Sequence, residues 1–111
     1  MKAYLVARKG EMRGDFWTLE AGQKLTLGRS PENRVVLRDD LCSRQHAEVF
    51  SQANGWYVRD LDSRNGTRVN GQLISKPTPL APRDSIQIGS NEFVLADDPA
   101  EFLPADRPNL A

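Results

Sequence analysis

The fold class is decided by the stretch HAEVFSQANGWYVRDL, residues 46–61. It contains two strand-like runs, residues 46–50 and 56–61, on either side of the turn-like segment Ala53-Asn54-Gly55. An Asn-Gly pair between two strand-like runs is a strong signal for a β-hairpin. The sequence therefore predicts an antiparallel pair of strands over residues 46–61.

The rest of the chain repeats this pattern of short strands and turns. Glycine or proline recurs almost every ten residues, which leaves room for strands but rarely for a helix of three turns. A second pair, Asn70-Gly71, and the segment from Gly10 to Gly14 predict two further hairpins. The other strand-like runs are residues 3–7, 16–19, 24–27, 34–37, 67–69, 72–74, 85–88 and 92–96. About ten short strands without a helical period predict an antiparallel β-sandwich.

Length and composition are typical of one compact domain followed by a segment of different character. The chain has 111 residues, of which 39% are hydrophobic and 27% charged, enough for a modest core under a polar surface. We assign residues 1–96 to the folded domain. Residues 97–111 contain four acidic residues, three prolines and one arginine, and we interpret them as an extended acidic tail or linker. The alternative is a packed C-terminal turn that uses Phe102 and Leu103.

Charge, hydropathy and cysteine content argue against several classes of protein. Fifteen Lys and Arg balance fifteen Asp and Glu, whereas a sequence-blind nucleic-acid binder needs surplus cations. No apolar stretch approaches the ~20 residues of a membrane helix, and charge returns too early for a signal peptide. Cys42, the one cysteine, has no partner for an internal disulfide. We therefore expect a cytoplasmic, monomeric module that binds neither nucleic acid nor membrane.

Polar residues that no strand requires gather in three segments: residues 28–30, 43–46 and 61–67. Loops of a sandwich cluster at its two ends, where a rigid frame holds them in place. If these three segments share an end, they bring together arginines, hydroxyls and an asparagine, with Asp62 as their one carboxylate. This set suits a phosphate ester, because arginine binds its oxygens in pairs while serine and turn N–H groups donate further hydrogen bonds.

Four short blocks in these segments resemble, in order and spacing, the forkhead-associated (FHA) domain. The blocks are Gly28-Arg29, Ser43-Arg44-x-His46, Ser63-x-Asn65-Gly66-Thr67 and Val69-Asn70-Gly71. The resemblance covers about residues 3–96. It implies an all-β, FHA-like sandwich of about eleven strands that binds phosphothreonine peptides in loops at one end. The implied partner is a phosphothreonine-containing protein or peptide, such as a Ser/Thr kinase or its substrate, and no cofactor is implied.

The resemblance also implies roles for individual residues. Arg29 and Ser43 would contact the phosphate with help from Arg44, and Asn65 would bond the ligand main chain just beyond the phosphothreonine. Arg64 stands where the family often has Thr, Ser or Lys. It would add a phosphate contact or turn outward to acidic residues of the ligand. The residues implied as structural support are Gly28, His46, Gly66 and Asn70. Among these, His46 would hold adjoining loops by hydrogen bonds, and Gly66 would supply a positive φ, as would Gly71.

Other functions are less well supported by the sequence. A hydrolase built on Ser43, His46 and Asp60 or Asp62 is disfavoured, because a Gly-x-Ser-x-Gly motif is absent and Ser43 lies too near His46 in the chain. Cys42 and His46 supply at most half of a zinc site, so no metal is expected.

An interaction module that does not depend on phosphate is the alternative function. The presence of Arg29, Ser43 and Asn65 favours the phosphate-dependent one. Selectivity beyond the phosphothreonine is expected to depend on Leu41, Arg64 and Arg68, with acidic or apolar ligand residues favoured there.

Overall fold

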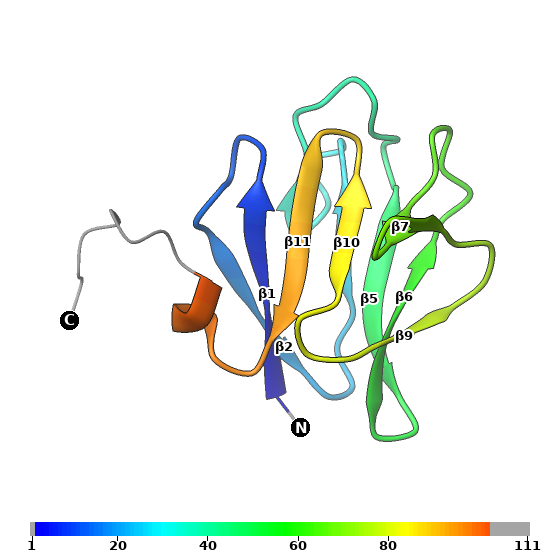
Figure 1. Cartoon of the computed structure of the whole chain (residues 1–111). Coiled ribbons are helices and arrows are strands. Elements are labelled where there is room, and N and C mark those ends of the chain that lie inside the picture. Colours follow the sequence, from blue (N-terminus) through cyan, green and yellow to red (C-terminus); the bar gives the residue numbers. More distant parts are fainter. Residues whose placement is uncertain (1, 103–111) are drawn as a thin grey trace.

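The computed structural model of the chain describes residues 2–102. These residues form eleven β-strands and one turn of 3-10 helix (Figure 1). The elements are β1 (Lys2–Lys9), β2 (Phe16–Glu20), β3 (Leu25–Gly28), β4 (Val35–Val36), β5 (Ala47–Gln52), β6 (Gly55–Asp60), β7 (Arg68–Val69), β8 (Gln72–Leu73), β9 (Thr78–Leu80), β10 (Ser85–Ile88), β11 (Asn91–Ala96) and η1 (Pro99–Phe102). The predicted all-β sandwich of about eleven strands is confirmed. Within residues 2–102, no helix has the length and apolar character needed to cross a membrane.

Two sheets make up the sandwich, with strand orders β2-β1-β11-β10-β7-β8 and β4-β3-β5-β6-β9. Pairing is antiparallel except between β3 and β4, where Leu27 pairs with Val35 in a parallel ladder. Whether a strand pairs parallel or antiparallel depends on the strand beside it, and the alternation of side chains within a strand does not show this. This one exception lies at the edge of the second sheet, and the prediction of an antiparallel sandwich holds elsewhere.

The hairpin of residues 46–61 is present as β5 and β6, but its turn differs from the expected one. Gln52 pairs with Gly55, so the two turn residues are Ala53 and Asn54, with φ of 50° and 63°. A two-residue hairpin loop of this twist needs positive φ at both positions. Gly55 therefore begins β6. In the second hairpin, between β7 and β8, the turn is the expected Asn70-Gly71 pair.

One strand, β9, has no counterpart among the predicted runs. It contains Pro79 and pairs only with β6, at the outer edge of its sheet. Proline has no N–H to donate to a neighbouring strand. It is tolerated at an edge because one side of an edge strand has no neighbour, although in a sequence it usually marks the end of a strand.

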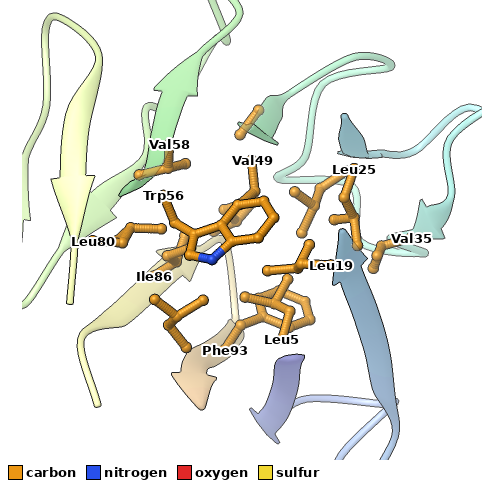
Figure 2. Close-up of a cluster of buried hydrophobic side chains, with 14 of the residues drawn as sticks. Leu5, Leu19, Leu25, Val35, Val49, Trp56, Val58, Leu80, Ile86 and Phe93 are labelled. Carbon is orange, nitrogen blue, oxygen red and sulfur yellow. The ribbon is translucent and has the colours of Figure 1, made fainter. Parts of the chain in front are cut away.

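Alternate side chains of the strands fill the space between the sheets. Figure 2 shows Trp56 among aliphatic side chains from both sheets, including Leu19, Leu80 and Ile86. Phe93 is fully buried in the same cluster. Burial of these side chains supplies the main driving force for closing the two sheets on each other.

A second, smaller apolar cluster lies on the outer face of the first sheet. Val6, Val94 and Ala96 are buried there, and Phe102 of η1 packs against them. The Arg8 guanidinium carbon lies 5.3 Å from the centre of the Phe102 ring. Residues 99–102 thus adopt a packed turn, as in the alternative that used Phe102. Leu103 and the rest of the segment to residue 111 lie outside the described residues.

We predict that Phe102→Ala lowers the free energy of unfolding by about 1–2 kcal/mol, because Val6 and Val94 lose their apolar cover. Urea unfolding measures the change. Glu101→Ala is the matched control on the same turn: it removes only an exposed ion pair with Arg83, of 3.1 Å, and should leave stability nearly unchanged. Equal urea midpoints for Phe102→Ala and the wild type would contradict the packing role.

Candidate functional site

Strand register brings the three polar segments to one end of the sandwich. Leu27 of β3 pairs with Ala47 of β5, which pairs in turn with Asp60 of β6. Because neighbouring strands run in opposite directions, the segments after β3, before β5 and after β6 leave the sheet together. They lie at the upper end in Figure 1. We call them the first loop (29–34), the second loop (38–46) and the third loop (61–67).

The first and second loops are joined backbone to backbone. Arg29 N–H donates to Ser43 O at 2.9 Å, and Ser30 N–H donates to Arg44 O at 3.1 Å. This approach requires a glycine at position 28, since a Cβ there would lie 2.2 Å from Arg44 O. The supporting role expected for Gly28 thus has a steric basis.

Asn33 also joins these loops, although no motif in the sequence points to it. Its side chain is buried, and Nδ2 donates to Arg44 O at 2.7 Å and to Ser30 O at 2.9 Å. Both partners are main-chain carbonyls, which no side-chain motif reveals.

Arg29 is oriented without being neutralised. Its Nε donates to Cys42 O at 3.1 Å, and the residue is exposed. Among residues 2–102, no salt bridge involves Arg29, Arg44 or Arg64. All three arginines are exposed, so their charges are available to an anion arriving at this end.

Ser43 and Asn65 connect the second loop to the third. Arg64 N–H donates to Ser43 Oγ at 2.9 Å, so the Ser43 hydroxyl acts as an acceptor and its own proton can be donated elsewhere. Asn65 Nδ2 donates to Leu41 O at 2.9 Å. The five predicted binding residues therefore lie on three loops that hydrogen bonds hold together.

His46 lies beneath these residues and is fully buried. Its Nδ1 accepts a hydrogen bond from Ser43 N–H at 3.0 Å, so the ring proton is on Nε2, which donates to Gly66 O at 2.8 Å. Gly66 has the expected positive φ, 86°. Both ring nitrogens are used by backbone groups. His46 thus has no nitrogen with which to take a proton from the Ser43 hydroxyl, as the hydrolase alternative requires.

Asp60 organises the third loop from below. Its carboxylate accepts hydrogen bonds from Ser63 N–H at 2.9 Å, Ser63 Oγ at 2.5 Å and Thr67 Oγ1 at 2.7 Å. Burial by itself raises the pKa of Asp60, but the bonds from Ser63 and Thr67 outweigh it and hold this pKa below its usual value. Asp60 therefore stays ionised as a structural acceptor, a role that no motif in the sequence indicates.

Two residues singled out from the sequence, Asn70 and Arg68, make their side-chain hydrogen bonds with the β7–β8 hairpin and the start of β10, and not with the three loops. Asn70 accepts from Ser85 N–H at 2.9 Å and donates to Asp84 at 3.1 Å, which fixes the β7–β8 turn to the start of β10. Arg68 lies on β7 and donates to Gly71 O at 3.3 Å.

Cys42 is buried in the second loop and is not disulfide-bonded. Burial raises the pKa of the Cys42 thiol to about 11. In the part of the chain that the structure describes, no group of three or more His, Cys, Asp and Glu residues is placed to hold a metal ion.

Comparisons with known proteins agree with this geometry. The family model of the FHA domain matches residues 25–89. The FHA domain-containing protein FhaB of Mycobacterium tuberculosis is 32% identical over 92 residues, covering 83% of this chain and 59% of FhaB. The chain thus spans about three-fifths of the length of that relative.

Solved FHA domains share the fold. The FHA domain of CT664 from Chlamydia trachomatis matches with a TM-score of 0.81 and 28% identity, covering 88% of this chain and 99% of that one. An FHA domain from a structural and functional analysis of phosphothreonine-dependent FHA interactions matches with a TM-score of 0.75 and 28% identity. That match covers 86% of this chain and 96% of the solved chain.

We predict that His46→Ala lowers the free energy of unfolding by on the order of 2–4 kcal/mol, because it leaves a cavity and two backbone groups without partners. The melting temperature should fall by roughly 10 °C or more. Amide hydrogen exchange at Ser43, whose N–H loses its acceptor, should quicken more than the global loss of stability explains. An unchanged melting temperature would show that these bonds do not support the loops.

Proposed function

This chain belongs to the FHA-domain family, and we propose that its three loops bind a phosphothreonine-containing peptide or protein. The observation that carries the proposal is the state of Arg29 and Ser43. Arg29 is fixed through Nε while its terminal nitrogens have no ion pair within residues 2–102, and the adjoining Ser43 has a hydroxyl proton to donate. A dianionic phosphate ester needs this combination of charge and directed donors.

Each remaining loop residue has a part in the proposed complex. Arg29 would bind two phosphate oxygens and Ser43 a third, with the charges of Arg44 and Arg64 adding attraction. Asn65 uses Nδ2 for Leu41 O, which leaves its carbonyl oxygen to accept an N–H of the ligand main chain just beyond the phosphothreonine. A small apolar niche near Ser43 and Asn65 would receive the threonine methyl.

The biological setting follows from the same proposal. The partner would be a Ser/Thr kinase or one of its substrates, and the chain would act as a monomeric binding module and not as an enzyme. A cytoplasmic, reducing compartment suits the buried free thiol of Cys42. We assign binding to residues 1–96, and we propose that residues 97–111, whose turn at residues 99–102 packs against the first sheet, form an acidic segment outside the binding site.

A competition titration with four matched peptides tests the function. The peptides share one sequence and carry phosphothreonine, phosphoserine, phosphotyrosine or unmodified threonine. We expect at least about fivefold preference for phosphothreonine over phosphoserine, since one buried methyl contributes about 0.8 kcal/mol and an empty niche costs more. The unmodified and phosphotyrosine peptides should not bind. Equal affinity for the two aliphatic esters would indicate a generic anion site, and binding of unmodified threonine would favour the phosphate-independent module.

Arg29→Ala should abolish measurable binding of the phosphothreonine peptide and leave the fold intact. It removes a charge-assisted, paired contact worth roughly 2–4 kcal/mol, or about 30- to 1,000-fold in affinity. Calorimetry measures the affinity. Arg83→Ala is the control, because Arg83 is an exposed arginine between β9 and β10 and its loss changes the net charge equally. Affinity within threefold of wild type in Arg29→Ala would refute the role of Arg29.

A further inference from the structure

Asp39 lies in the second loop and closes a tight turn there. It is not among the residues to which the proposed function gives a part. Its Oδ1 accepts from Leu41 N–H at 2.9 Å, and its main-chain oxygen accepts from Cys42 N–H at 2.9 Å. The carboxylate and main chain of Asp39 thus fix the backbone of residues 39–42. Ser43 follows directly in the chain.

The other carboxylate oxygen of Asp39 is bound by the opposite sheet. Ser90, in the turn between β10 and β11, donates to Oδ2 through its hydroxyl at 2.6 Å and through N–H at 3.0 Å. The turn approaches closely because residue 89 is glycine, where a Cβ would lie 2.7 Å from the same oxygen. These bonds to Ser90 and Leu41 hold the pKa of Asp39 below its usual value.

The turn fixed by Asp39 presents two carbonyl groups to the binding residues. Leu41 O accepts from Asn65 Nδ2 at 2.9 Å, and Cys42 O accepts from Arg29 Nε at 3.1 Å. Arg29 and Asn65 come from different loops. Their side chains are nevertheless oriented by successive carbonyls of one turn.

We propose that Asp39 is a positioning residue for phosphopeptide binding. Anchored to Ser90 of the opposite sheet, it sets the Leu41 and Cys42 carbonyls that orient Asn65 and Arg29. The proposal rests on the proposed function of these loops. Asp39 itself does not contact the ligand: its role is exerted through the backbone of residues 41 and 42.

Asp39→Asn is the sharpest variant, because it keeps the size of the side chain. The asparagine side chain has one acceptor oxygen and one NH₂ group. Its NH₂ must therefore face either the two Ser90 donors or Leu41 N–H, and an N–H group in either place cannot accept a hydrogen bond from it. Ser90→Ala removes the hydroxyl donor and keeps the N–H bond. We expect Asp39→Asn to weaken binding of the phosphothreonine peptide about tenfold and Ser90→Ala about threefold. The double variant should resemble Asp39→Asn within twofold, because both changes act on one interaction.

NMR chemical shifts of the ligand-free protein distinguish a local change in the loops from a general loss of stability. The Arg29 Nε–H and the Asn65 side-chain amide protons should shift in Asp39→Asn, because their acceptor carbonyls move. Val94→Ala is the matched control: it removes apolar packing on the outer face of the first sheet. It should lower stability but leave those proton shifts and the peptide affinity unchanged.

The outcomes separate this proposal from the proposed function. If the wild type binds no phosphothreonine peptide, the proposed function falls and the role of Asp39 falls with it. If the wild type binds and Asp39→Asn binds within twofold of it, only the role of Asp39 is overturned. Weakened binding without a change in the Arg29 and Asn65 proton shifts would show that Asp39 does not act through the Leu41 and Cys42 carbonyls.

Discussion

Four hydrogen bonds made by one residue, His46, hold the proposed binding end of the sandwich together. Its main-chain N–H donates to Leu27 O and its main-chain oxygen accepts from Leu61 N–H, both at 2.9 Å, while its ring binds Ser43 and Gly66. The ring is fully buried, so water cannot replace a lost partner. The positions of β3, the second loop and the third loop are therefore set together by the main chain and the ring of this one residue. The exposed residues of the candidate site depend on that constraint, since they extend from loops that His46 holds in place.

Most of the hydrogen bonds that build the candidate site are made by residues other than those proposed to bind the ligand. Below the surface, neutral side chains such as Asn33 and His46 satisfy main-chain carbonyls and N–H groups, and Asp60 gathers the donors of the third loop. At the surface, Arg29 and Arg64 keep charges that no acidic residue of the described chain pairs. Because these arginines are exposed, water lowers the cost of leaving them unpaired. Although Arg29 Nε and Asn65 Nδ2 each donate to a loop carbonyl, the terminal nitrogens of Arg29 and the hydroxyl proton of Ser43 stay available to a ligand.

Strands, turns and motifs that are local in the chain could be predicted from the sequence, whereas contacts between distant segments could not. The alternation of side chains and the hairpin of residues 46–61 predicted the sandwich. The four short blocks predicted which loops form the candidate site. Pro79 concealed β9, and the two-residue β4 gave no sign of its parallel direction. The contact between Asp39 and Ser90 was equally hidden, because the two residues lie 51 positions apart along the chain. Such contacts follow no spacing rule, since they depend on how the two sheets face each other.

The arrangement of β1 and β11 limits how a tethered ligand could reach the loops. Tyr4 pairs with Ala96, so the start of β1 and the end of β11 lie side by side, opposite the turn at Ser90 that contacts the second loop (Figure 1). If a phosphothreonine lies on a segment attached next to either of these strand ends, that segment must run the full length of the sandwich to reach the loops. Eight residues of strand, the length of β1, span ~26 Å. Self-binding therefore requires a tether of at least roughly eight extended residues, whereas a separate partner molecule meets the loops without obstruction from either strand end.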